Sequence, residues 1–135
     1  MSKKILVTGG AGFIGSYLVG SLLVRGNEVA VLDNLSSGGL ENPSKRLNKR
    51  NFRFVKGDLL RPYDVEDDLD DCEVVFHLAA NPEVKVGSVK PSVHFRQNVL
   101  ATYNLLEMLT TCCWMFQRLR GLDGNRGITA LRLCG

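Results

Sequence analysis

Short apolar runs alternate with segments of helical pattern along most of this chain. Phe13–Arg25 carries apolar residues at helical spacing, at Ile14, Leu18 and Leu22, and Gly26 supplies a helix stop. The runs between such segments are predicted to be strands of a parallel sheet, because three of them are mostly apolar and Phe52–Lys56 alternates. They are Lys3–Thr8, Glu28–Asp33, Phe52–Lys56 and Glu73–Ala79.

The segments between the later runs predict loops and further short helices. Asn34–Asn42 is rich in Ser, Gly and Asn and is predicted to be a loop, followed by a short basic helix over Pro43–Arg50. Pro62 favours the start of an acidic surface helix over Tyr63–Leu69. Asn81–Lys90 is predicted to be a polar loop.

A long amphipathic helix is predicted to begin at Pro91. Its apolar positions include Val93, Val99, Leu100, Tyr103, Leu106 and Leu109. Strands that alternate with helices at this spacing predict a parallel sheet with helices on both faces. Right-handed crossovers then give the strand order 3-2-1-4, which is an α/β fold of Rossmann type, and Ile128–Leu133 is a candidate fifth strand.

A glycine-rich loop, Gly9–Gly15 (GGAGFIG), joins the first strand to the first helix. In dinucleotide-binding folds one such glycine permits a sharp turn, another lets the backbone approach a pyrophosphate, and a third lets the helix pack against the sheet. The start of the helix then favours phosphate charge. Two registers fit this pattern, Gly10-x-Gly12-x-x-Gly15 and Gly9-x-x-Gly12-x-x-Gly15.

Aspartates end the second and third predicted strands. Asp33 lies about 20 residues beyond the loop, where a carboxylate would bond the adenosine ribose and repel a 2′-phosphate, so NAD is favoured over NADP. Asp58 lies at the same edge of the sheet, where it could bond adenine or could be a turn residue ahead of Pro62. The sequence therefore predicts an NAD site at the carboxyl ends of the strands.

Two other groups of chemistry-bearing residues have simpler explanations. His77 lies in an apolar strand and is predicted to be a core histidine satisfied by backbone groups, because no carboxylate or nucleophile accompanies it in sequence. A basic cluster follows the second strand and is predicted to be a solvated helix face. It consists of Lys45, Arg46, Lys49 and Arg50.

The composition is ordinary for a soluble globular domain, with 44% hydrophobic and 23% charged residues in a chain of 135. No stretch approaches the roughly 18 apolar residues that a membrane span needs. Lys3 and Lys4 precede an apolar run too short for a signal peptide, so a cytoplasmic location is expected. The cysteines lack metal-site spacing and are expected to be reduced thiols, with no metal site: Cys72, Cys112, Cys113 and Cys134.

The positive charge is confined to the end of the chain. Residues 1–109 carry 13 basic and 13 acidic residues, whereas the last 26 residues carry four arginines and one aspartate. The net charge of +3 therefore does not indicate nucleic-acid binding by the folded body. The residue pattern also changes near Thr110, so 1–109 is predicted to be the domain and 110–135 an atypical tail.

Five segments, in order along the chain, resemble the extended short-chain dehydrogenase/reductase family. They are TGGAGFIGS (8–16), DNLSSG (33–38), GDL (57–59), HLAANP (77–82) and NVLATYNLLE (98–107). Within that family they are most similar to the NAD-dependent nucleotide-sugar epimerases and dehydratases of UDP-glucose 4-epimerase type. The resemblance implies NAD as the cofactor and a UDP-sugar as the substrate, which such enzymes oxidise at C4 and then reduce on the other face.

The same resemblance assigns cofactor-binding roles residue by residue, and it favours the second glycine register. Asp33 matches the acid that binds the ribose, and Asn98 matches an asparagine on the helix beneath the active site. The other matches are Gly9, Gly12, Phe13, Ile14 and Gly15 at the pyrophosphate, Asn34, Ser37 and Gly38 beside the ribose, Asp58 and Leu59 at the adenine, and Leu78, Ala79 and Ala80 along the cofactor.

The catalytic pair of the family is absent from the sequence. The family transfers protons with Tyr-x-x-x-Lys and a nearby Ser or Thr, and the lysine lowers the pKa of the tyrosine. Here the residues four positions after Tyr17, Tyr63 and Tyr103 are a serine, an aspartate and a glutamate. No catalytic residue is therefore assigned.

Several hypotheses follow for the tail and for function. The tail fits either a lost middle segment or shifted reading frame, or a genuine C-terminal helix and strand. The chain itself fits the NAD-binding part of an epimerase or dehydratase that is inactive in this form, a non-catalytic NAD-binding module, or a subunit completed by a partner. Apolar faces left uncovered would favour poor solubility or a homo-oligomer.

Overall fold

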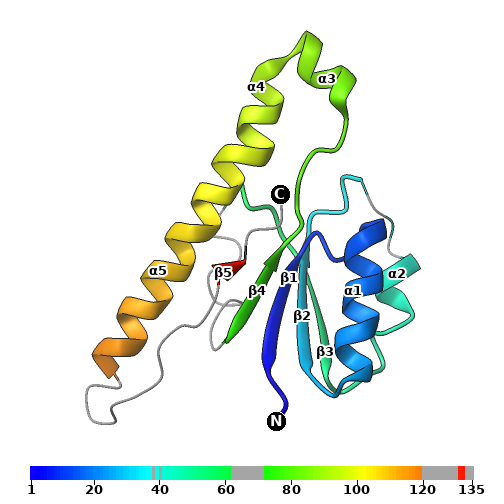
Figure 1. Cartoon of the computed structure of the whole chain (residues 1–135), viewed down its shortest axis with the longest axis vertical. Helices are drawn as coiled ribbons and strands as arrows, with labels where there is room; N and C mark the ends of the chain where they lie inside the picture. The colour runs from blue at the N-terminus through cyan, green and yellow to red at the C-terminus, as the bar shows by residue number, and fades with distance from the viewer. Residues whose placement is uncertain (38, 40, 62–71, 120–130, 133–135) are drawn as a thin grey trace.

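The computed structural model describes residues 1–37, 39, 41–61, 72–119 and 131–132. Within them a parallel sheet forms with the order β3-β2-β1-β4-β5 (Figure 1). Its strands are β1 (Lys4–Thr8), β2 (Glu28–Asp33), β3 (Phe52–Lys56), β4 (Val74–His77) and β5 (Leu131–Arg132). The predicted order 3-2-1-4 is confirmed, and the described part of the candidate fifth strand pairs with β4.

Helices lie on both faces of the sheet, as the alternating pattern predicts (Figure 1). Helix α1 and the short α2 lie on one side, and the long C-terminal helix lies on the other. The helical segments are α1 (Phe13–Val24), α2 (Glu41–Ser44), α3 (Val84–Val89), α4 (Pro91–His94), the π-helical η3 (Phe95–Leu100) and α5 (Ala101–Leu119). No helix in the described part of the chain has the length and apolarity to span a membrane.

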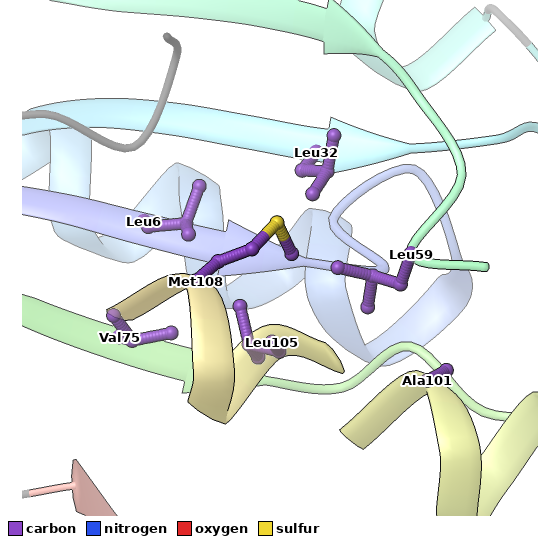
Figure 2. Close-up of a cluster of buried hydrophobic side chains, with 7 residues drawn as sticks. All are labelled: Leu6, Leu32, Leu59, Val75, Ala101, Leu105 and Met108. Atoms are coloured by element: carbon purple, nitrogen blue, oxygen red, sulfur yellow. The ribbon is translucent and has the colours of Figure 1, made fainter. Parts of the chain in front are cut away.

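Alternate residues of the strands point to opposite faces of the sheet and belong to two hydrophobic clusters, one on each face. Between the sheet and α1 lie Ile5, Val7, Val19, Leu23, Val29, Val31 and Phe52. Between the sheet and α5 lie Leu6, Leu32, Leu59, Val75, Ala101, Leu105 and Met108. Figure 2 shows Leu105 and Met108 of α5 pointing toward the strands that carry Leu6 and Leu32. The two clusters fix the sheet between its helices and so fix the edge at which the strands end.

Helix α1 has the predicted bounds within one residue, but the predicted apolar face is displaced. Its buried residues are Gly15, Ser16, Val19 and Leu23, whereas Ile14 is 71% exposed. The close approach of Gly15 to the glycine loop turns that side of the helix inward, so Leu18 and Leu22 only flank the core. The helix prediction is confirmed, and the apolar residues at helical spacing do not mark the buried face of the helix.

Two connecting segments differ from their predicted structure. The basic helix over Pro43–Arg50 is wrong: α2 ends at Ser44 and is followed by turns in which Arg46 N–H bonds Pro43 C=O at 2.9 Å. The loop over Asn81–Lys90 instead contains α3, where Gly87 leaves room for the ring of His94. A Cβ on Gly87 would lie 2.7 Å from His94 Cδ2, so tertiary packing outweighs the low helix propensity of glycine.

The long helix begins at Pro91 as predicted, but a π-helical segment interrupts it at η3. A π turn contains more residues than an α turn, so the face of the helix rotates at this point. Val99 and Tyr103 are consequently 55% and 53% exposed, whereas Ala101 and Leu105 reach the core. A single helical period carried through the segment therefore predicts the wrong buried face.

Some predictions fall outside the described residues or are not tested by them. The acidic helix over Tyr63–Leu69 lies outside the described residues, as do Ile128–Ala130 and Gly38. The boundary between 1–109 and 110–135 falls inside α5, whose backbone continues to Leu119. The division into a domain and a tail stays a prediction.

Candidate functional site

The glycine loop leaves β1 through a turn that requires glycine at its first position. Gly9 has a φ of +69°, and its N–H bonds the carbonyl of Leu32 on the neighbouring strand at 2.9 Å. A Cβ on Gly9 would lie 2.7 Å from the backbone nitrogen of Ala79, just beyond β4. Gly9 therefore lets the loop pass between the ends of β2 and β4.

The next glycines differ in why they are needed. A Cβ on Gly15 would overlap the carbonyl oxygen of Gly9 and lie 2.7 Å from Gly10 Cα. A Cβ on Gly10 would lie 2.7 Å from a methyl group of Val31. A Cβ on Gly12 would meet only the Gly9 carbonyl oxygen, at 3.4 Å, which is an ordinary contact. Protein packing thus explains Gly10 and Gly15, and it leaves room above Gly12 for a ligand.

Helix α1 starts at this loop with an uncapped N-terminus. Its first backbone bond runs from Ser16 N–H to the carbonyl of Gly12 at 2.9 Å, and no side chain caps the helix. The first turn carries no acidic residue. The amide groups and the positive end of the helix dipole are therefore available to an anion.

Two aromatic or aliphatic side chains flank this helix start on the solvent side. Phe13 is 78% exposed, and its ring lies 5.3 Å from that of Tyr17 in an edge-to-face arrangement. Ile14 is exposed beside it. Both Phe13 and Ile14 thus lie at the loop, as the pyrophosphate assignment requires, with their side chains open to contact.

Asp33 ends β2 and holds the glycine loop in place. Its half-buried carboxylate accepts the N–H of Ala11 at 2.9 Å and the N–H of Leu35 at 2.8 Å. The second bond holds Leu35 in the left-handed region, with a φ of 62°. Each carboxylate oxygen retains a lone pair after one such bond, so Asp33 can still accept a hydrogen bond from a ribose hydroxyl.

The loop after Asp33 contains the other predicted ribose contacts. Asn34 and Ser37 are exposed, and Asn34 Oδ1 accepts the N–H of Ser36 at 2.9 Å. The neighbouring Gly38 lies outside the described residues. Asn34 and Ser37 are therefore accessible at the edge where Asp33 lies.

Asp58 lies beside Asp33, because the N–H of Gly57 bonds the Asp33 carbonyl at 3.2 Å. The carboxylate of Asp58 accepts the N–H of Leu60 at 2.9 Å, which is the geometry of a turn residue. Leu59 has its side chain in the core, only 6% exposed, and its carbonyl accepts Asn104 Nδ2 at 2.8 Å. Any contact of Leu59 with a ligand therefore falls to its backbone.

His77 connects the end of β4 to β1 and to α5. Its Nδ1 lies 2.6 Å from Thr8 Oγ1, and its Nε2 lies 2.9 Å from Thr102 Oγ1. Thr102 donates its own proton to the Asn98 carbonyl, so His77 Nε2 carries the hydrogen and Nδ1 accepts from Thr8. Burial lowers the pKa of His77, which agrees with this neutral form.

The expectation of a satisfied histidine is confirmed, but its partners are hydroxyl groups rather than backbone groups. Thr8 also accepts the N–H groups of Leu78 and Ala79, at 3.2 and 3.3 Å. These bonds fix the predicted cofactor strand end beside the glycine loop, with Ala80 exposed next to it. The register Thr8↔His77 follows from pairing β1 with β4 in parallel, so aligning those strands would have revealed the contact.

Asn98 lies in η3, and both ends of its side-chain amide bond protein groups. Its Oδ1 accepts the N–H of Asn81 at 2.7 Å, and its Nδ2 lies 3.2 Å from His94 Nδ1. The ring of His94 in turn donates to the carbonyl of Glu83 at 2.9 Å through Nε2. Asn98 therefore positions the chain after β4, which is the edge of the site.

Comparison with known proteins finds a family match over most of the chain. The sequence model of the NAD dependent epimerase/dehydratase family matches residues 5–119. The chain belongs to this family. The match extends ten residues beyond Leu109, into the predicted tail.

Two relatives and one solved structure illustrate the match. A UDP-glucose 4-epimerase of Mycolicibacterium smegmatis is 44% identical over 110 residues, covering 77% of this chain and 34% of the relative. A UDP-glucuronic acid decarboxylase of Arabidopsis thaliana is 36% identical over 103 residues, covering 76% of this chain and 22% of the relative. The structure of a Thermus thermophilus UDP-glucose 4-epimerase in complex with NAD is 40% identical, with a TM-score of 0.68, covering 89% of this chain and 35% of that one.

The chain thus spans about a third or less of the length of these relatives. The matched part includes the glycine loop, both aspartates and the end of β4. The family model confirms the nucleotide-sugar epimerase/dehydratase resemblance of the sequence.

Proposed function

We propose that this chain is the NAD-binding part of a nucleotide-sugar epimerase or dehydratase and does not turn over a sugar by itself. The observation that carries the proposal is the hydrogen bond from Ala11 N–H to Asp33, which joins the glycine loop to the acid proposed to bind the ribose. The uncapped start of α1, the open space above Gly12 and the carboxylate of Asp33 therefore lie together at one edge of the sheet. Ligands of open parallel sheets bind at this edge.

The residues present fit NAD part by part. The helix start and Gly12 would hold the pyrophosphate, Asp33 the adenosine ribose, and Asp58 the adenine. The Asp33 carboxylate would repel the 2′-phosphate of NADP, so NAD is preferred. Leu78, Ala79 and Ala80 would lie along the cofactor at the end of β4. NAD, when bound, would supply hydride acceptance and return.

Proton transfer to a sugar in this family uses a tyrosine followed four positions later by a lysine, and neither Tyr17 nor Tyr103 has that lysine. Tyr103 donates its hydroxyl to Glu107 at 2.6 Å, and this bond together with the negative charge of Glu107 raises the pKa of Tyr103. A phenolate is thereby disfavoured near neutral pH. We therefore assign no catalytic residue and propose cofactor binding alone.

A UDP-sugar is the proposed substrate class. Epimerases and decarboxylases of UDP-sugars both match this part of the chain, so the shared part is proposed to bind NAD and not to select the sugar. The alternative is that a partner subunit completes the site of this chain.

NAD binding is tested by titrating the purified chain in a calorimeter. Asp33→Ala is expected to lose most of the affinity, because it removes the ribose acceptor and the bond that holds Ala11. Glu28→Ala is the matched control, since it removes an exposed acid at the other end of β2. Equal NAD affinity in Asp33→Ala and the wild type would contradict the proposal.

Turnover is tested separately with UDP-glucose and UDP-galactose in the presence of NAD. We expect no interconversion by this chain alone. Measurable interconversion would contradict the assignment of a binding role and would require a catalytic group outside the tyrosines considered above.

A further inference from the structure

The segment after β2 contacts the glycine loop through Asn42 and the start of α1 through Arg46. The sequence pattern gave Asn42 no role and predicted that Arg46 is solvated. Asn42 Nδ2 donates to the carbonyl of Ala11 at 3.2 Å. Arg46 donates from Nη1 to the carbonyl of Asn42 at 2.8 Å and from Nη2 to the carbonyl of Ser16 at 3.1 Å. Figure 1 shows α2 beside α1, which agrees with these bonds.

Ala11 is therefore held through both of its backbone polar groups. Asp33 accepts its N–H at 2.9 Å, and Asn42 donates to its carbonyl. The side chain of Ala11 is only 1% exposed. The two peptide groups on either side of the Ala11 Cα are thus fixed in orientation, one from the end of β2 and the other from the segment that follows.

We call the contacts of Asp33 and Asn42 with Ala11 the brace of the loop. Arg46 extends this brace to the first turn of α1. Ser16, whose carbonyl it bonds, follows the predicted pyrophosphate residues directly and is buried. Gly20 leaves room for the guanidinium, because a Cβ there would lie 3.2 Å from Nη2. Both acceptors in these bonds are neutral backbone carbonyls, so neither bond neutralises the positive charge of Arg46.

The basic cluster thus contains residues of two kinds. Arg46 is half-buried and bonded to two backbone groups, whereas Lys45 and Lys49 are exposed. The expectation that all four residues form a solvated helix face is wrong for Arg46. It is right about the exposure of the two lysines.

We infer that Asn42 and Arg46 are positioning residues for NAD, holding Ala11 and the start of α1 in the shape that receives the pyrophosphate. The inference rests on the proposed function. Neither residue has to touch the cofactor, because each acts through a backbone carbonyl of the loop or helix. A loop fixed before binding does not have to be ordered when NAD binds, and this preorganisation increases affinity.

The test compares Arg46→Met with Lys45→Met, which removes the same charge from the neighbouring exposed side chain. Arg46→Met is expected to weaken NAD binding about 10-fold, as loss of a supporting contact commonly does. Lys45→Met is expected to bind like the wild type. Asn42→Ala, which changes no charge and removes the bond to Ala11, is expected to follow Arg46→Met.

Two further readouts separate positioning from a general effect on folding. Binding of adenosine, which has no phosphate, is expected to change less than about twofold in Arg46→Met, because the ribose acid and the adenine edge stay in place. The Ala11 amide of the ligand-free chain is expected to exchange its hydrogen faster in both Asn42→Ala and Arg46→Met. Rescue by Arg46→Lys is expected to be partial, since an ammonium lacks the planar fork that reaches both carbonyls.

Equal NAD affinity in Arg46→Met and Lys45→Met would overturn the inference while leaving the proposed function intact. Faster exchange at Ala11 with unchanged NAD affinity would also overturn it, because the brace would then be structural only. Equal losses of NAD and adenosine would overturn it in favour of general destabilisation. Failure of the folded wild type to bind NAD would instead contradict the proposed function, on which the inference depends.

Discussion

At the scale of single residues, the glycines of the loop differ in whether the surrounding protein leaves space for a side chain at their position. Gly9 and Gly15 leave no space for a Cβ against protein backbone, whereas Gly12 meets only an ordinary contact. A glycine that the protein's own packing does not require is best explained by a ligand that approaches it. The difference between Gly12 and Gly15 therefore gives a test that separates folding from binding.

We predict that Gly12→Ala keeps the stability of the chain and loses NAD, whereas Gly15→Ala loses both. Gly12 has φ −71° and ψ 177°, which alanine adopts freely, so the expected change in the free energy of unfolding is below about 0.5 kcal/mol. Gly15→Ala should cost about 1–3 kcal/mol through overpacking against Gly9 and Gly10. Urea denaturation and NAD titration measure the two effects, and full NAD affinity in Gly12→Ala would contradict the pyrophosphate assignment.

At the scale of elements, the strands and their order could be predicted from the local sequence pattern. The buried faces of the helices and the side-chain contacts between elements could not. The sequence pattern predicts a strand over Glu28–Asp33, and β2 has the same bounds. The exposed Val99 and the buried Ala101 depend on a π turn, which no average helical period predicts. The loop, Asp33 and Asp58 could be placed from sequence because strand ends meet at one edge of a parallel sheet.

Side chains that act across elements escaped the sequence pattern for a different reason. Arg46 has the same local context as Lys45, and only the approach of α1 distinguishes them. Thr8 and Thr102 are ordinary strand and helix residues until His77 lies between them. Such roles arise from tertiary distance, which residue type alone does not encode.

The contacts of His77 predict how stability depends on pH. Because burial lowers its pKa below the ordinary 6.5, the unfolded chain binds this proton first as the pH falls. The stability contributed by neutral His77 is therefore full above the unfolded pKa and is lost as the pH falls toward the folded pKa. The loss cannot exceed about 1.4 kcal/mol per pH unit for one proton.

Urea denaturation at a series of pH values from about 7.5 to about 5.5 tests this coupling of β1, β4 and α5. His77→Gln is expected to be less stable at neutral pH and to show a smaller loss on acidification than the wild type. Comparing the two chains removes the contribution of carboxylates, which titrate in both. The same loss of stability in both chains would contradict the assigned role of His77.

At the scale of the whole molecule, exposed apolar side chains predict self-association. Phe95, Val99 and Tyr103 follow one another at intervals of four residues on the long helix and are 59%, 55% and 53% exposed. Apolar area of this kind is commonly covered by another surface. We expect light scattering to give a mass above that of the monomer, and Val99→Lys to lower it.

Val24→Lys is the matched control for that substitution. Val24 is 85% exposed at the end of α1, on the other side of the sheet from the long helix (Figure 1). It is expected to leave the measured mass unchanged. A strictly monomeric wild type, or an equal effect of the two substitutions, would contradict self-association through the long helix.

The central claim is that the glycine loop and Asp33 together form an NAD site, and paired calorimetric titrations with NAD and NADP test it most directly. The account predicts saturable binding of NAD at one site per chain. It also predicts affinity for NADP lower by at least about 10-fold, because the Asp33 carboxylate opposes the 2′-phosphate. No binding of NAD by the folded chain, or equal affinity for the two dinucleotides, would contradict it.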